Sequence, residues 1–133
     1  MDKKKNLSNP RLIIIQKLYS HYINKEEVIK FKKNRYKKFI KDVVFGTLER
    51  KELIEENIQR YLIKDINIRR TETMLIIFLH AAIFELLFRP QTSINIIINE
   101  YLNSSKFFLN EKQKNFLNAM LDKISNKIRH KNG

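Results

Sequence analysis

The sequence predicts an all-α fold, a compact bundle of six to seven helices around a central apolar helix. Glycine and proline contribute only 2 residues each to the 133, which is too few for the turns of a β-rich protein. Apolar residues recur at three- and four-residue steps along most of the chain, as they do on one face of a helix. Residues 74–88 are apolar except for His80 and Glu85, as expected for a helix surrounded by other helices. This length suits one domain, 1–133, in which we expect residues 1–8 to form a flexible basic tail.

Capping residues and apolar spacing define the first three helices. Asn9 can cap a first helix with Pro10 in its first turn, and the predicted apolar stripe is Leu12, Ile15, Tyr19 and Tyr22. Residues 24–35 are polar and lysine-rich, so they form either a short helix or a linker. The second helix carries Tyr36, Phe39, Ile40, Val43 and Val44. Gly46, near its end, either lets another backbone approach closely or ends a turn. The third helix carries Leu53, Ile54, Ile58, Tyr61 and Leu62.

Stop and start signals separate the remaining helices. The central helix spans about residues 72–88 and is stopped by Arg89-Pro90, because proline cannot continue a helix. Ser93 can open the next helix, whose inward residues are Ile94, Ile97, Ile98, Tyr101 and Leu102. Asn110, with Gln113 three residues later, matches the capping box that begins a helix. This last helix is expected to bury Leu117, Met120, Leu121, Ile124 and Ile128.

Positive charge is concentrated at the two ends of the sequence. Of the formal net charge of +13, residues 1–41 carry 13 lysines and arginines against 3 carboxylates, and residues 106–133 carry 7 against 2. Residues 42–105 carry 7 against 9. If the two ends pack together they form one positive surface, which would attract a polyanion through counterion release. Alternatively, the many lysines could reflect a coding bias toward lysine, isoleucine and asparagine. Such a bias does not explain why residues 42–105 carry almost no net charge.

The residues needed for catalysis, metal binding or membrane insertion are scarce. There are no cysteines, which excludes a disulfide scaffold and fits a reducing cytoplasm. Glycines are too few for a phosphate-binding loop, and His21, His80 and His130 lack the spacing of metal ligands. We therefore expect no enzyme activity, no metal and no cofactor. The apolar runs are too short for a signal peptide or a membrane span, so we expect a cytoplasmic protein without a membrane partner.

Three polar residues on apolar helices have two interpretations each. His80 is either a hydrogen-bonded core histidine, which we favour, or a ligand or base. Glu85 and Glu100 could form an acid and base pair in a cleft. We favour instead ion pairs with buried basic residues or helix caps, because a buried charge needs a partner.

Short motifs are spread along most of the chain. They are Arg11, Gln16-Lys17-Leu18-Tyr19, Asp42 to Gly46, Phe84-Glu85-Leu86-Leu87, Ile98-Asn99-Glu100, Lys106, and Phe116 to Lys123. No single motif is decisive, but their order and spacing together are specific, and they resemble those of the NusB family of bacterial transcription antitermination factors. The chain departs from the family pattern at His80 (often arginine), Ser93 (usually proline) and Asn115 (commonly lysine). Lysines also replace an N-terminal arginine cluster, and lysine binds phosphate as a point charge without a planar fork.

The resemblance implies a fold of two packed helical halves and a set of macromolecular partners. NusB proteins form a heterodimer with NusE, a small-subunit ribosomal protein, and the pair binds single-stranded boxA RNA within the RNA polymerase antitermination complex. Some relatives instead form homodimers that hide the RNA face. RNA lies along the first helix and the start of the last helix. The RNA-binding residues implied here are Lys3, Lys4, Lys5, Arg11, Gln16, Tyr19, Lys112, Lys114, Phe116 and Asn118.

These side chains suit single-strand recognition. The lysines and Arg11 would hold phosphates, Tyr19 and Phe116 would stack bases, and Gln16 would read base edges. Both aromatic residues could instead pack in the core, and Asn118 is either a base reader or a local hydrogen-bonder. Two other classes are weighed against this function. They are a domain related to the N-terminal domain of ribosomal RNA cytosine methyltransferases, and a basic helical protein that binds anionic membrane surfaces.

Overall fold

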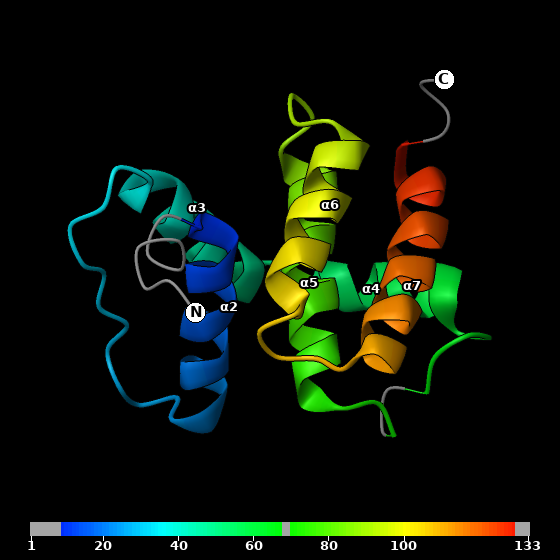
Figure 1. The fold of residues 1–133 in the computed structure, drawn as a ribbon, viewed down its shortest axis with the longest axis horizontal. Coiled ribbons are helices and arrows are strands. Elements are labelled where there is room, and N and C mark those ends of the chain that lie inside the picture. The colour runs from blue at the N-terminus through cyan, green and yellow to red at the C-terminus, as the bar shows by residue number, and fades with distance from the viewer. Residues whose placement is uncertain (1–8, 68–69, 130–133) are drawn as a thin grey trace.

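The computed structural model describes residues 9–67 and 70–129, and within them it contains six helices and no strand. The helices are α2 (Pro10–Ile23), α3 (Lys37–Glu49), α4 (Lys51–Leu62), α5 (Thr73–Phe88), α6 (Ile94–Ser105) and α7 (Glu111–Arg129). Figure 1 shows α2 and α3 on one side of α5 and α7 on the other, with α6 in front of α5. The predicted all-α class is confirmed. Lys3, Lys4 and Lys5 lie outside the described residues.

Helix α5 is the centre of the molecule because every other described helix packs against it. Its apolar side chains therefore find neighbours on all sides, and ten of its residues are buried. Phe78 is fully buried and Phe84 is 8% exposed. This confirms the prediction that residues 74–87 form the core helix. The rings of Phe78 and of Tyr101 on α6 also pack edge to face, with centroids 6.4 Å apart.

The predicted helix starts are confirmed by their caps. Asn9 Oδ1 accepts hydrogen bonds from the backbone N–H groups of Arg11 and Leu12, at 3.1 and 3.2 Å. Ser93 Oγ accepts from the N–H of Ile96 at 3.2 Å. The capping box of α7 is reciprocal: Asn110 Oδ1 accepts from the Gln113 N–H at 2.8 Å, and Gln113 Oε1 accepts from the Asn110 N–H at 2.9 Å. These side chains satisfy backbone donors that a helix start leaves unpaired.

The C-terminal end of α5 is capped from a distant part of the chain. Arg129, the last residue of α7, donates to the carbonyl oxygens of Glu85, Leu86, Arg89 and Thr92 at 3.3, 2.9, 3.0 and 2.6 Å. One side chain thus satisfies both the end of α5 and the turn that follows it. This contact fixes the end of the last helix against the central helix.

The buried face of α2 differs from the sequence prediction. In α2, Tyr19 and Tyr22 are 38% and 54% exposed, whereas Ile14 and Leu18 are buried. The buried face is rotated toward α5 and α3, which cover that side of α2.

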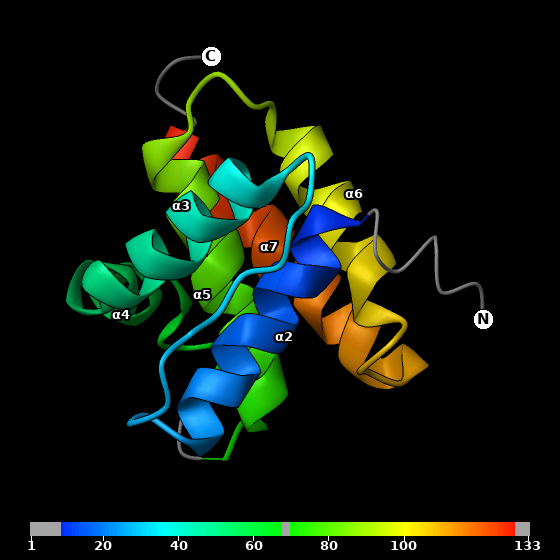
Figure 2. The ribbon, with the colours of Figure 1, turned by 90° about the vertical axis from the view of Figure 1, so that its left-hand side faces the viewer.

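Residues 24–36 contain no helix and form an extended linker that passes across α2 (Figure 2). Of the two alternatives for 24–35, the linker is therefore correct.

Gly46 makes room for a side chain rather than for another backbone. A Cβ at this position would lie 2.2 Å from Cζ of Phe84. The Phe84 ring stacks on Phe88 with centroids 5.2 Å apart, so it has little freedom to move aside. The glycine lets α3 and α5 approach closely at this point.

Candidate nucleic-acid interface

The described parts of the two predicted RNA-binding segments lie on the same side of the molecule, with α6 between them. Helix α2 packs against α3, α5 and α6, whereas α7 packs against α4, α5 and α6. The first turns of α2, helix α6 and the first turns of α7 lie on the near side in Figure 1 and on the right-hand side in Figure 2. Ser104 of α6 reaches the cap of α2, with its Oγ 3.5 Å from Asn9 Oδ1. A single strand of RNA that contacts both predicted segments would therefore pass over α6.

Arg11 is placed differently from what the sequence predicted. Its side chain is buried, and its guanidinium donates to the Glu85 carboxylate from Nε at 2.9 Å and from a terminal nitrogen at 2.7 Å. Tyr101 donates to the same carboxylate at 2.5 Å. Arg11 is thus a core residue that joins α2 to α5, and this corrects the expectation that it holds an RNA phosphate. The prediction that Glu85 pairs with a buried basic residue is confirmed.

The surroundings of this ion pair explain how the charges are tolerated inside the protein. The Arg11 guanidinium lies over the rings of Phe39 and Tyr101, with centroid distances of 5.0 and 5.6 Å. Burial alone would lower the pKa of Arg11, but the hydrogen bonds and charge of Glu85, together with Tyr101 and Glu100, outweigh it and raise the pKa. Burial, and then the charge of Glu85, raise the pKa of Tyr101 well above its usual value. Both partners of Glu85 therefore remain protonated donors at neutral pH.

Most of the other predicted residues are accessible. Gln16, Lys112 and Asn118 are exposed, Lys114 is half-buried, and Tyr19 has 38% of its surface exposed. Phe116 differs, because it is partly buried and packs against the core. Of the two aromatic residues, Tyr19 therefore offers the more accessible ring for stacking.

Glu85 is buried in an ion pair, whereas His80 is half-buried and lines a hollow. Glu85 is fully buried and bound by Arg11 and Tyr101, so it does not face a cleft with Glu100. Burial, and then the charge of Lys51, lower the pKa of His80 to about 4. The Glu55 carboxylate lies 3.9 Å from His80 Nε2 but is 44% exposed, so it does not offset the burial. His80 is neutral at physiological pH.

The part of the chain that the structure describes offers neither a metal-binding cluster nor a membrane span. No group of three or more histidine, aspartate or glutamate side chains there is placed to hold a metal ion. No helix within residues 9–67 and 70–129 is long and apolar enough to cross a membrane.

One basic segment was not among the predicted binding residues. Lys30, Lys32 and Lys33 lie on the exposed linker beside α2, and Lys37 begins α3. The sequence signal was the density of lysines in 24–41, which contributed to the charge of the first end. Only the fold shows that these residues lie along α2.

A family model and several sequence relatives indicate the same protein family. The NusB family model matches residues 8–126. A relative from Heliobacterium modesticaldum, "Transcription antitermination protein NusB", is 34% identical over 95 residues, which cover 71% of this chain and 46% of the relative. The protein of that name from Mesorhizobium japonicum is 29% identical, over 65% of this chain and 56% of the relative. The chain thus spans about half the length of these two relatives.

Other matches are more extensive. The protein of the same name from Thermodesulfovibrio yellowstonii is 30% identical, over 83% of this chain and 77% of the relative. A solved structure of T. maritima NusB superimposes with a TM-score of 0.77 and 23% identity, covering 89% of each chain. That likeness concerns the fold, whereas the family model and the sequence relatives establish descent. The chain belongs to the NusB family.

Proposed function

We propose that this chain is a transcription antitermination factor that binds single-stranded boxA-like RNA without catalysing a reaction on it. The observation that carries the proposal is the family match over residues 8–126, together with relatives named as antitermination proteins. The exposure of the predicted contact residues supports it. Lys112, Lys114 and Asn118 lie on the first turns of α7, and Gln16 and Tyr19 lie on α2.

In the proposed mechanism some residues contact the phosphates of the RNA and others contact its bases. Lys112 and Lys114 neutralise phosphates, which gives affinity without sequence preference. Tyr19 offers an aromatic face for one base, and Gln16 and Asn118 offer amide groups that can donate to and accept from base edges. Arg11 supports this surface from inside by holding α2 on α5.

The proposed partners are NusE and, through it, the RNA polymerase antitermination complex. RNA contacts that rest on a few lysines and one aromatic ring give modest affinity by themselves. When two RNA-binding proteins are bound to each other, contact of one with an RNA makes the contact of the other with the same RNA intramolecular, and this raises the affinity of the pair for the RNA. We therefore propose that this chain and NusE bind boxA RNA together more tightly than either does alone.

RNA binding with and without NusE tests the proposal directly. Fluorescence anisotropy would compare a boxA-like RNA with an oligouridylate of the same length. We expect a preference for the boxA-like RNA that increases when NusE is added. Lys112→Glu should weaken binding, while Lys127→Glu, with the same charge change on the last turn of α7, should have little effect. Equal binding of both RNAs, with and without NusE, would contradict the proposal.

A further inference from the structure

The linker between α2 and α3 runs back along α2 and encloses a groove between them. One hollow of about 400 Å³ lies between α2 and linker residues 27–30, and its other lining residues are Lys17, Ser20, His21 and Asn24. A second hollow of about 390 Å³ lies between α2 and residues 31–34, and its other lining residues are Ile13, Gln16, Lys17, Lys37 and Ile40. Later linker residues thus lie beside earlier residues of α2, as Figure 2 shows for the backbone. We call the two hollows together the linker groove.

The linker is held in place by an aromatic anchor. The rings of Phe31 and of Phe45 on α3 pack edge to face, with centroids 5.5 Å apart and planes at 64°. The ammonium groups of Lys17 and Lys41 lie 5.8 and 5.9 Å from the Phe31 centroid. The groove is therefore a formed feature of the fold rather than a gap beside a loose loop.

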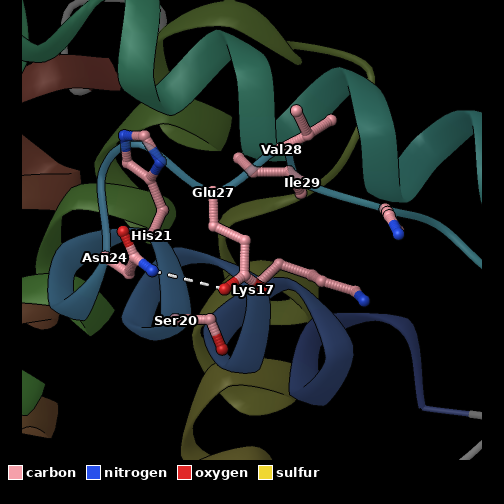
Figure 3. A pocket seen from close by; sticks show the side chains of 8 residues that line it. Lys17, Ser20, His21, Asn24, Glu27, Val28 and Ile29 are labelled. Carbon is pink, nitrogen blue, oxygen red and sulfur yellow. Dashed lines mark hydrogen bonds between the residues drawn. The ribbon is translucent and has the colours of Figure 1, made fainter.

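The two hollows differ in charge. The second hollow is lined by Lys17, Lys32, Lys33 and Lys37, and no carboxylate lines it. The first hollow contains Glu27, whose carboxylate accepts a hydrogen bond from Asn24 Nδ2 at 3.3 Å. In Figure 3 the Lys17 side chain extends away from Glu27 and Asn24. The basic half of the groove is thus the half beside the N-terminal part of α2.

Gln16 connects this half of the groove with the candidate interface. Gln16 lines the second hollow and is also exposed on α2. Tyr19, the exposed aromatic residue of the candidate interface, lies one helical turn away on the same helix. A single strand of RNA that contacts Tyr19 can therefore follow α2 past Gln16 and enter the groove.

We propose that the basic half of the linker groove binds the sugar–phosphate backbone of single-stranded RNA that flanks the boxA-like segment. This inference rests on the proposed function and extends its site by Lys32, Lys33 and Lys37. Lysine is a mobile point charge, which suits phosphates at variable positions rather than the planar pairing by which arginine reads a base. The groove therefore adds affinity for flanking RNA of any sequence.

The test compares two RNAs and two matched double variants. One RNA carries the boxA-like element alone, and the other carries it with about ten uridines added on each side, within the range that single-strand sites cover. Lys32→Glu/Lys33→Glu changes the groove, and Lys64→Glu/Lys127→Glu makes the same charge change at two exposed positions, one just after α4 and one in α7. Thermal melting checks the fold of each variant. Lys37→Glu replaces the groove variant if that variant does not fold.

We expect the extension to raise the affinity of the wild-type protein and of the control variant. In the groove variant this gain should disappear. Affinity for the long RNA should fall on the order of tenfold at 0.1 M salt, and the slope of log affinity against log salt should become shallower by about 1.4, which is two phosphate contacts. Affinity for the short RNA should change by the same small factor in both variants.

Other results would overturn the inference. Equal losses on the long RNA in both double variants would show that only net charge matters. A loss in the groove variant that is equally large on the short RNA would place these lysines within the boxA-like contact instead. If the wild type does not prefer the boxA-like RNA, the proposed function fails, and an oligouridylate alone then tests the groove. Binding of vesicles containing an anionic lipid through these lysines, without binding of oligouridylate, would also overturn it.

Discussion

The guanidinium of Arg11 and the carboxylate of Glu85 form two parallel hydrogen bonds, of 2.9 and 2.7 Å, across 74 residues of sequence. The pair connects the first turn of α2 with the last turns of α5. Tyr101 adds a third element by donating to Glu85 from α6. One carboxylate therefore fixes the relative position of three helices, of which α2 carries proposed RNA contacts.

Removing Arg11 should destabilise the fold without removing an RNA contact. Arg11→Met leaves the fully buried Glu85 carboxylate without its cation, and such a loss costs about 3–5 kcal/mol. Urea unfolding measures the change, and Arg11→Met/Glu85→Leu should recover part of it. RNA affinity, measured at low temperature on folded protein, should be close to that of the wild type. If Arg11→Met instead left the stability unchanged and weakened RNA binding, Arg11 would be a residue that contacts RNA.

Gly46→Ala should lower stability because of a clash with Phe84. The added Cβ would lie 2.2 Å from the ring, and overpacking of this kind costs about 1–3 kcal/mol. Alanine is better than glycine inside a helix by about 1 kcal/mol, which offsets part of the loss. In a Phe84→Leu background the clash is relieved, so Gly46→Ala should become neutral or stabilising. A double-mutant cycle by urea unfolding checks this, and additive effects would contradict the close contact.

Stability should fall between pH 6.5 and pH 4 because of His80. The folded state lowers the pKa of His80 from 6.5 to about 4, so in this window the unfolded chain binds a proton that the folded chain does not. The contribution is fully present above pH 6.5, is lost as the pH falls, and changes no further below pH 4. The expected loss is up to about 3 kcal/mol. His80→Gln should make the unfolding free energy less dependent on pH in this window, and an unchanged profile would rule out His80 as the cause.

Tyr19→Ala distinguishes base stacking from core packing. If Tyr19 stacks a base, its loss should weaken RNA binding by about 1–3 kcal/mol and leave the salt dependence nearly unchanged. Tyr22→Ala is the matched control, because Tyr22 is on the same helix and is more exposed. A lower melting temperature with intact affinity would assign Tyr19 to the core and leave recognition to the lysines and the amide side chains.

Helix starts and the central helix could be predicted from the sequence because their signals are local. Asn9, Ser93 and the Asn110–Gln113 pair cap helices through side chains only two or three residues from their partners. The apolar run of α5 needs no partner to be recognised. The orientation of α2 is a different case, because which face is buried depends on where α3 and α5 lie.

The binding residues were harder to predict because exposure is a property of the whole fold. Arg11 matched the family pattern in sequence, but only the position of Glu85 on α5 shows that its charge is already paired. The linker lysines were visible as composition, yet their place beside Gln16 depends on the Phe31 anchor. Charge along a sequence thus indicates a polyanion partner but does not identify the contacting groups.

The cap that Arg129 supplies to α5 has a consequence for synthesis of the protein. The ribosome completes Arg89 forty residues before Arg129, a delay of about 2–8 seconds at ordinary rates of elongation. During that time α5, the most apolar helix, has neither α7 along its side nor the arginine on its last carbonyl groups. The apolar surface of α5 that α7 covers therefore has no partner until α7 has been made, and uncovered surface of this kind is prone to aggregation.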